Sequence, residues 1–555
     1  MRKLMLLLLI LPIALFSIAQ NGKEPVKVTD MLKIKSISGA NLSKDGSKAV
    51  FTVTSIEPEG DNKLEYKYVN QLWIAGTDSD TKPRQLTTAR ESSSQGVFSP
   101  DGKQLVFVRA VDGRSQLFLL SLEGGEALQL TKFKYGAGNP KWSPDGKQIL
   151  FSANIPFKEL LKDSLLNPGK ELPKWPMEKP GFKNNEQLKP ASAKADPDGS
   201  IEEVRAYLEN NAHDKKAKVF TKLNFLDEMD TNPDMGFTHF FLIEAKTDAK
   251  PTAITKGFFR YTYAEVTPDG KQLILAGNMD STQHPDRALE GEIFIVNTNG
   301  SNLKRILGEK DRNYNSPRLS PSGKWLAFQY GNTSFVSVPA LAIMPLNGSV
   351  KEKADIPFDR NKGNITWSDD EQYIYFSAQS NGGQPVYRVD LKTKKAEQLT
   401  DFNSGIGSFD IAANKMVFVK TEVASPFEVY VADAAAKNQK KISDFNTGWI
   451  ADKKLSFPEK HSFKNEKGME VEYWVMKPSN YEPGKKYPLL LEIHGGPSAM
   501  WGPGESSMWH EYQFFCSKGY GVVYANPRGS GGYGINFLRG NINDWGAGPT
   551  KDVLT

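Results

Sequence analysis

Two glycine-rich loops near the end of the sequence have residue types suited to stabilising a developing negative charge. The aliphatic run 489–493 is followed by His-Gly-Gly-Pro at 494–497, and the run 521–525 is followed by Asn-Pro-Arg-Gly-Ser-Gly-Gly-Tyr-Gly at 526–534. Because glycine has no Cβ, the backbone can turn sharply there and bring an N–H group close to an oxyanion. The first loop alone would also fit a glycine turn in any α/β protein, and the second loop at this spacing favours the chemical interpretation.

The elements that must position these loops follow from the same stretch. Both aliphatic runs are short enough to be buried strands, and a helix-length segment of about twenty residues separates them. Upstream, two alternating runs, 461–463 and 469–475, flank a polar turn and predict a β-hairpin. We therefore expect an α/β sheet to open near residue 456.

The two loops together resemble the start of the catalytic domain of the prolyl oligopeptidase family of serine peptidases. The His-Gly-Gly-Pro spelling is most similar to the acylaminoacyl-peptidase branch and its bacterial dipeptidyl-peptidase relatives. The resemblance implies that the backbone N–H of Gly496 is one donor of an oxyanion hole. It also implies that His494, Gly495 and Pro497 shape the loop that presents this donor.

A nucleophile of the expected kind is missing from this sequence. Serine hydrolases carry a Ser on a strand-turn-helix elbow, usually Gly-x-Ser-x-Gly, followed by an acid and a His. Ser530 is the serine most similar to this elbow, but residue 528 is Arg where the motif has Gly, and we expect no helix after Ser530. Ser506 and Ser507 do not fit the motif either. No histidine follows an elbow; the six are His213, His239, His284, His461, His494 and His510.

We therefore expect the chain to be truncated before the nucleophile, with the catalytic Ser, Asp and His beyond Thr555. Two parallel strands and a hairpin cannot bury their aliphatic rows on both faces, which supports an incomplete hydrolase domain. A natural, inactive remnant is the alternative.

Upstream, a turn-and-strand pattern recurs seven times between the start of the chain and residue 455. Typical copies are Ser-Pro-Asp-Gly at 99–102 and 143–146, and a faded copy begins at Asp410. Pro fixes φ, Asp bonds the local backbone and Gly takes the positive φ of a tight turn. Most copies recur at roughly 44–56 residues, which predicts an all-β seven-bladed propeller over 20–455.

One interval of the repeat is too long and indicates an insertion at about 155–234. It is rich in Lys, Glu, Pro and Asn and predicts a helix over 201–211. The resemblance implies that a carboxylate pair from the propeller binds the substrate's amino terminus in the dipeptidyl-peptidase relatives. Glu202 and Glu203 are candidates, although a solvated helix face explains them equally well. Asp227, Glu228 and Asp230 are weaker candidates.

The first nineteen residues predict a cleavable signal peptide, with cleavage near Ala19-Gln20. Arg2 and Lys3 precede a short apolar run, and no later segment predicts a stable membrane span. We therefore expect a secreted or periplasmic protein; an uncleaved anchor is the alternative.

The composition argues against several other classes of function. The net charge of +5 is small and evenly spread, which argues against nucleic acid as a partner. Cys516 is the single cysteine and lies on the apolar face of a predicted helix, so we expect it to be packed rather than reactive. No His or Cys pair has metal-ligand spacing, so we predict neither a metal nor a cofactor.

The leading hypothesis is an exported serine peptidase that hydrolyses short peptides through an acyl-enzyme, as a dipeptidyl- or acylaminoacyl-peptidase. The fragment by itself would lack the triad and be inactive. A non-catalytic periplasmic propeller that binds proteins, similar to TolB-like proteins, is the alternative from another class. An esterase with the same chemistry is a third. The sequence leaves side-chain preference and oligomeric state open.

Overall fold

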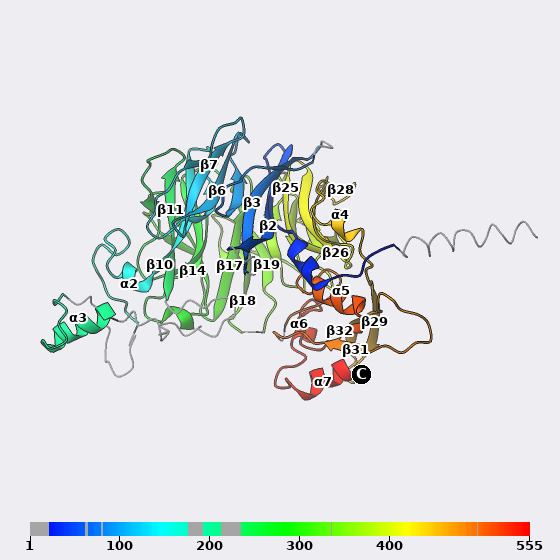
Figure 1. The fold of residues 1–555 in the computed structure, drawn as a ribbon. Coiled ribbons are helices and arrows are strands. Elements are labelled where there is room, and N and C mark those ends of the chain that lie inside the picture. The colour runs from blue at the N-terminus through cyan, green and yellow to red at the C-terminus, as the bar shows by residue number, and fades with distance from the viewer. Residues whose placement is uncertain are drawn as a thin grey trace, which may run out of the picture. The chain divides into compact units, whose positions relative to one another are not determined.

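The computed structural model describes residues 22–60, 65–78, 82–175, 192–211, 235–334, 336–496 and 498–555. The predicted signal peptide and Pro497 lie outside these residues, as do Asp227, Glu228 and Asp230. By internal contacts the chain divides into two compact units. Unit 1 comprises 1–109, 334–341 and 355–555, and unit 2 comprises 110–333 and 342–354. Figure 1 gives the element labels.

In the described part of the chain before residue 456, the strands form seven four-stranded sheets, each connected in chain order. Three of these sheets belong to unit 1: β1 (Ser36–Leu42), β2 (Lys48–Glu59), β3 (Glu65–Gly76) and β4 (Arg84–Gln85); β21 (Gly363–Trp367), β22 (Tyr373–Ser377), β23 (Val386–Asp390) and β24 (Ala396–Gln398); β25 (Gly405–Ala412), β26 (Lys415–Glu422), β27 (Ser425–Asp433) and β28 (Lys440–Lys441).

Two sheets belong to unit 2: β9 (Gly138–Trp142), β10 (Gln148–Pro156), β11 (Gly236–Glu244) and β12 (Thr252–Ala253); β13 (Arg260–Val266), β14 (Gln272–Asn278), β15 (Glu292–Asn297) and β16 (Lys304–Leu307). The remaining two sheets are β5 (Ser93–Phe98), β6 (Gln104–Val111), β7 (Arg114–Ser121) and β8 (Leu128–Gln129); and β17 (Arg312–Leu319), β18 (Trp325–Asn332), β19 (Ala340–Pro345) and β20 (Ala354–Ile356).

The repeated turns join the first two strands of their sheets in the predicted way. In one copy the Ser99 hydroxyl donates to Asp101 (2.6 Å) and accepts from the Gln104 amide (2.9 Å). Gly102 has a φ of +69°, and the corresponding glycines at 46, 146, 270 and 323 have φ between +67° and +72°. A side chain at these positions would be strained, which is why the turn requires glycine.

The short Gln-Leu-Thr segments stabilise the outer part of several sheets. The Thr87 hydroxyl accepts the Leu72 amide (2.9 Å) and donates to the Gln71 side chain (2.6 Å). Thr131 makes the same two bonds to Leu117 and Gln116 (2.9 and 2.7 Å). These bonds satisfy backbone amides of the third strand that lie beyond the end of the short fourth strand.

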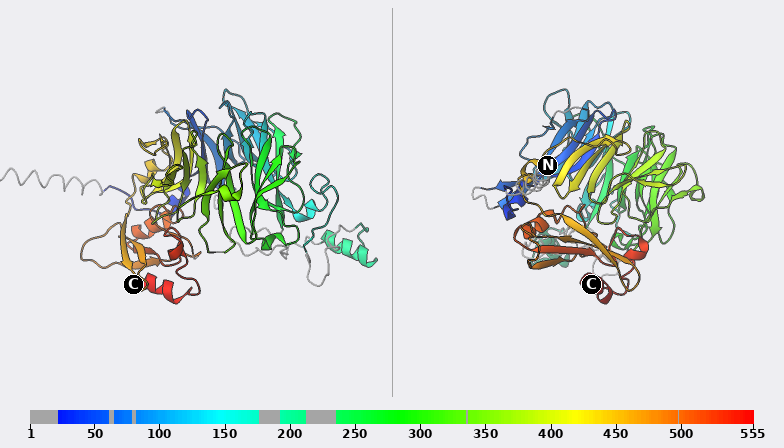
Figure 2. Two further views of the ribbon diagram at one scale, coloured as in Figure 1. Left: turned by 180° about the vertical axis from the view of Figure 1, so that it is seen from behind. Right: turned by 90° about the vertical axis from the view of Figure 1, so that its right-hand side faces the viewer.

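Inside unit 1 the first and last repeated sheets are neighbours, as the blue and yellow strands of Figure 2 show. Buried side chains of both sheets, among them Phe51 and Val419, form one hydrophobic core. The Leu42 amide also donates to Asp410 (2.9 Å), which crosses from one sheet to the other. Contact between the first and last repeats is what closure of a propeller requires.

After residue 456 the topology changes to one mixed sheet in the order β29-β30-β32-β31. Its strands are β29 (Pro458–Lys464), β30 (Glu470–Met476), β31 (Leu489–Glu492) and β32 (Gly521–Asn526). β29 and β30 form the predicted hairpin, and β31 pairs parallel with β32 as expected for an α/β sheet. The boundary near residue 455 stays a prediction, because the contact-based units divide the chain elsewhere.

The helices of this region gather around the mixed sheet (Figure 1). They are α5 (Trp509–Ser517), α6 (Ile535–Leu538) and α7 (Ala547–Leu554). Tyr512 and Cys516 of α5 pack with Trp474 and Tyr524 in a buried core. At the outer strand β31, by contrast, Leu489 and Ile493 are 62% and 60% exposed.

The loop between β22 and β23 contacts the segment that follows the His-Gly-Gly-Pro loop, within unit 1. The Gly504 amide donates to the Gly382 carbonyl (3.2 Å), and a Cβ at Gly502 would overlap the Gly382 backbone, whereas a Cβ at Gly382 would overlap the Trp474 ring. A Cβ at Gly405 would likewise overlap the backbone of Gly504. We call these two glycine pairs, Gly382/Gly502 and Gly405/Gly504, the glycine contact.

The remaining short elements lie mostly in loops. They are η1 (Val28–Lys33) and α4 (Thr447–Ile450) in unit 1, and α2 (Phe157–Leu160), α3 (Ile201–Asn211), η3 (Pro285–Arg287) and η4 (Val350–Glu352) in unit 2. α3 is the helix predicted for the insertion. Across the described residues, none of the helices has the length and apolar character needed to span a bilayer.

Candidate functional site

The loop after β31 is held against the loop after β32 by four polar contacts. Since the two strands are parallel, their carboxyl ends meet at one edge of the sheet, where α/β proteins bind ligands. The buried Asn526 side chain accepts the Trp501 amide (2.9 Å) and donates to the Trp501 carbonyl (2.7 Å). The Gly531 amide lies 3.1 Å from the carbonyl oxygens of both Ser498 and Ala499.

The fourth contact joins two side chains that sequence reasoning treated separately. His494 Nε2 lies 3.0 Å from the Ser530 hydroxyl, and both side chains are buried. The Ser530 hydroxyl also lies 2.7 Å from the Pro527 carbonyl, and His494 Nδ1 lies 3.2 Å from the Gly495 carbonyl. Burial lowers the pKa of His494. Because both side chains are buried, their contact fixes the two loops against each other.

Gly496 has the conformation that an oxyanion loop requires. Its φ is +112°, and an added Cβ would lie 3.3 and 3.1 Å from the Ser498 and Ala499 amides. A cavity of about 550 Å³ borders the loop and is lined by residues 493–496, with Arg528, Trp545 and Leu554 on other sides. The backbone of the predicted donor therefore borders an open space, although its role as donor stays a prediction.

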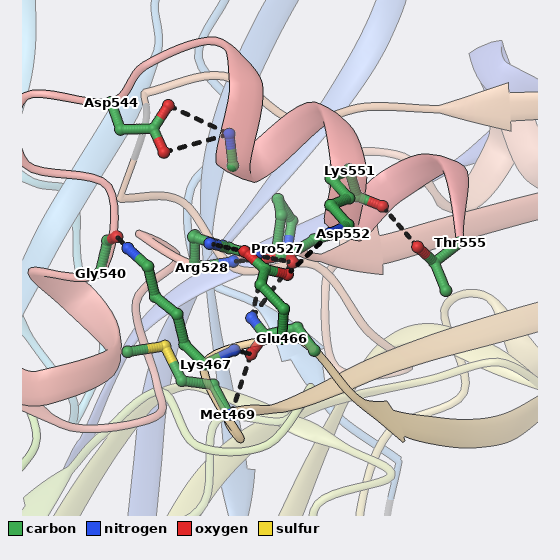
Figure 3. A network of polar contacts seen from close by, with 12 residues as sticks. Glu466, Lys467, Met469, Pro527, Arg528, Gly540, Asp544, Lys551, Asp552 and Thr555 are labelled. Atoms are coloured by element: carbon green, nitrogen blue, oxygen red, sulfur yellow. Dashed lines mark hydrogen bonds and ion pairs between the residues drawn. The ribbon is translucent and has the colours of Figure 1, made fainter.

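A buried ion-pair network supports the second loop from beneath (Figure 3). Arg528 is 1% exposed, and its guanidinium makes two hydrogen bonds to Asp552 of α7, one of 2.8 Å from Nε. The Arg528 amide also donates to Asp552 (2.9 Å), and Glu466 binds Nη1 (2.6 Å). Asn465 donates to Asp552 as well (3.1 Å).

This network links the hairpin turn, the second glycine-rich loop and α7 to one another. The hydrogen bonds that the guanidinium donates to Asp552 raise the pKa of Arg528 above its usual value, so Arg528 stays charged despite its burial. Paired charges of this kind are stable only while every partner is present. This pairing could not be predicted from local sequence, because Arg528 lies 24 positions from Asp552.

The expectation that no helix follows Ser530 is wrong. α6 begins at Ile535, because the Asp359 carboxylate accepts the Ile535 amide (3.0 and 3.1 Å) and supplies an N-terminal partner that the local sequence lacks. The helix has four residues and follows a second glycine turn. Ser530 therefore does not lie on a strand-turn-helix elbow.

The other described candidates for the site, Glu202 and Glu203, belong to unit 2. The Glu203 carboxylate accepts the Ser200 amide (2.7 Å) and the Ser200 hydroxyl accepts the Glu203 amide (3.4 Å), which is a capping box at the start of α3. Glu202 is exposed on the same turn. Their role toward a substrate amino terminus stays a prediction.

Cys516 is packed, as predicted. It is fully buried in the core beneath β32, and burial raises the pKa of its thiol to about 11. A thiol in this environment is a poor nucleophile. Within the described residues, no group of three or more His, Cys, Asp or Glu side chains is arranged to hold a metal ion.

Comparison with known proteins finds relatives that align with nearly the whole chain. The sequence profile of the prolyl oligopeptidase family matches residues 506–555. An uncharacterized peptidase, YuxL, from Bacillus subtilis is 25% identical over 96% of this chain and 75% of its own length. Dipeptidyl-peptidase 5 from Porphyromonas gingivalis is 23% identical over 97% of this chain and 73% of its own length.

The fold is shared with solved peptidases. The acylaminoacyl peptidase of Pyrococcus horikoshii superposes with a TM-score of 0.67 at 18% identity, covering 96% of this chain and 71% of that structure. The likeness supports a β-propeller for the repeated sheets, followed by an α/β-hydrolase fold. Residues 506–555 match the prolyl oligopeptidase family of serine peptidases, and nearly the whole chain is similar to peptidases in sequence and fold.

Proposed function

We propose that the protein is an exported serine peptidase that hydrolyses short peptides through an acyl-enzyme, with dipeptidyl- or acylaminoacyl-peptidase specificity. The observation that carries the proposal is the Gly496 loop, whose positive φ and four anchoring contacts hold its backbone beside an open cavity. Preorganised amides of this kind stabilise the oxyanion of acyl transfer without having to reorganise during the reaction.

The nucleophile, its base and the orienting acid are expected in sequence beyond Thr555. Two observations support this. The described residues hold the loop that would contribute one oxyanion donor, and Ser530 does not lie on a strand-turn-helix elbow. In addition, this chain spans 73–75% of the two curated relatives named above, which leaves about a quarter of their length outside the alignment.

The specificity is inferred from the relatives, which include a dipeptidyl-peptidase and an acylaminoacyl peptidase. The non-catalytic binding propeller is less favoured, because the family profile matches the region of α5 to α7 rather than the repeated sheets. Export rests on the charged and apolar pattern of residues 1–19.

The test is activity-based labelling of the protein made from its complete reading frame. We expect a fluorophosphonate to label one serine, and Gly496→Pro to lower kcat for a dipeptide substrate by roughly 10²–10³, because proline removes the N–H donor. Gly484→Pro places a similar backbone restraint in an exposed turn of the same region and should leave kcat unchanged. Absence of labelling, or full activity in Gly496→Pro, would exclude this mechanism.

A further inference from the structure

Unit 2 contains a large cavity that the proposed chemistry does not use. Its volume is about 1150 Å³, and strands β9, β10, β11, β13 and β17 contribute to its lining. A second space of about 400 Å³ shares Arg260, Thr262, Tyr263 and Arg318 with it. Cavities that bind small molecules have volumes of roughly 300–1000 Å³, so the larger space is sufficient for a short peptide.

The charged groups that line this cavity are mainly cationic. Lys141, Arg260 and Arg318 contribute three positive charges, and Asp286 contributes one negative charge. Lys141 and Arg318 occupy the same position of the repeat, two residues before the serine that opens each tight turn. Both follow a register shift in the first strand of their sheet, and such bulges redirect side chains.

The two cations lie against one aromatic ring. Lys141 Nζ is 3.8 Å from the centroid of the Tyr263 ring, and Arg318 Cζ is 4.4 Å from it. Lys141 also donates to the Ala264 carbonyl (2.9 Å), and the Tyr263 hydroxyl bonds to Glu265 (3.1 Å). An ammonium and a guanidinium, the two groups that bind carboxylates in proteins, therefore both contact the same ring at the cavity.

The electrostatics of Lys141 also favour an anion in this cavity. Burial lowers the pKa of Lys141 to about 8; Glu265 opposes this shift and the positive charge of Arg318 adds to it. A carboxylate bound between the two cations would offset both the desolvation and the repulsion. Neutral polar groups, including Asn139, Ser152 and Thr238, line the same space and suit a peptide backbone.

We propose that this cavity binds the carboxylate of a short peptide, with Lys141 and Arg318 as its direct contacts and the exposed Arg260 as a further positive charge. The inference rests on the proposed peptidase function and deepens it, because it names a charged group of the substrate. The carboxylate can be the peptide's C-terminus or an acidic side chain, and the two sources are distinguishable by experiment.

The experiment is calorimetric titration of the chain with Ala-Ala-Ala, with its C-terminal amide and with Ala-Asp-Ala-amide. We expect the free acid to bind at least 10-fold more tightly than Ala-Ala-Ala-amide and to lose affinity as salt is raised. Arg318→Gln should weaken binding of the acid by at least 10-fold. Lys147→Gln removes an exposed lysine in the turn after β9 and should leave binding unchanged.

Arg260→Gln serves as a second variant, because Arg260 is exposed and its loss leaves the core intact. We expect this variant to bind the free acid with several-fold weaker affinity. Thermal unfolding checks that each variant is folded. Tight binding of Ala-Asp-Ala-amide would identify a side-chain carboxylate as ligand. Equal affinity for acid and amide, no binding of the acid at millimolar concentration, or unchanged binding in folded Arg318→Gln would overturn the proposal.

The outcomes also separate this inference from the proposed function. If the complete protein fails to react with a fluorophosphonate but the chain still discriminates acid from amide, the peptidase mechanism fails and the cavity assignment stands. If the serine is labelled and the chain shows no such preference, the cavity assignment fails alone.

Discussion

The repeated sheets and the mixed sheet of β29–β32 are stabilised in different ways. The repeated sheets satisfy many polar groups locally, through turns such as Ser99–Asp101 and threonines such as Thr131, although the bond from Leu42 to Asp410 joins two sheets. The mixed sheet depends on contacts between distant segments, chiefly Arg528 with Asp552 and Asn526 with Trp501. A substitution in one repeat should therefore lower stability only slightly. A substitution in the Arg528–Asp552 network should lower the stability of the whole mixed-sheet region.

The largest effect is expected from breaking the buried ion pair. Asp552→Ala leaves the Arg528 guanidinium buried without its main partner, and we expect a loss of about 3–5 kcal/mol in the stability of the mixed-sheet region. Hydrogen exchange of peptides from 520–555, compared with peptides from the repeated sheets, measures where the loss occurs. Lys551→Ala changes an exposed residue of the same helix and should cost less than about 0.5 kcal/mol. Equal protection in Asp552→Ala and the native chain would contradict the comparison.

A smaller, pH-dependent loss of stability is expected at the repeat that has a histidine, His239, where two other repeats have glutamine. His239 occupies the place of Gln71 and Gln116, and its Nδ1 lies 3.0 Å from the Thr255 hydroxyl. Burial lowers the pKa of His239 to about 4, whereas an unfolded histidine titrates near 6.5. The unfolded state therefore binds the extra proton, so stability is full above pH 6.5 and declines as the pH falls toward 4.

Denaturant unfolding at several pH values tests this expectation. The decline should reach on the order of 3 kcal/mol by pH 4. His239→Gln introduces the side chain found at positions 71 and 116 and should remove that part of the acid sensitivity while keeping stability near neutral pH. An identical pH profile in the variant would show that other groups cause the acid unfolding.

The smallest effect is expected from a single threonine of the repeat. Thr131→Val removes the acceptor for the Leu117 amide and the donor to Gln116, at a cost of about 1–3 kcal/mol. Hydrogen exchange should show the change in β7 and β8 and leave the other sheets protected as before. Loss of protection in all repeated sheets would mean that the repeats are coupled more strongly than their local bonding suggests.

The sequence predicted most of the elements, because their signals are local. The tight turns, the hairpin and the two strands around 489 and 521 each follow from a few adjacent residues. The contact of His494 with Ser530 and the ion pair of Arg528 could not be predicted in this way. They depend on how two loops and a helix meet, and the α6 helix depends on Asp359, which lies 176 positions away.

The cationic cavity of unit 2 could not be predicted from local sequence signals either. Lys141 and Arg318 are separated by most of unit 2 in the sequence, and only their equal places in the repeat connect them. The repeat predicts the turns, whereas the residue two positions before each turn differs among the copies and belongs to no motif. The chemistry of such a surface becomes visible only when the sheets are assembled.

The glycine contact between the β22–β23 loop and the segment 500–504 has one further consequence. Where two backbones touch without side chains, no rotamer change can absorb a small displacement, so the contact is either complete or lost. The segment 500–504 directly follows the loop of Gly496, which therefore receives its position partly from Gly382 and Gly405 of the propeller. A substitution at either glycine would therefore displace the loop of Gly496 without changing any residue of that loop.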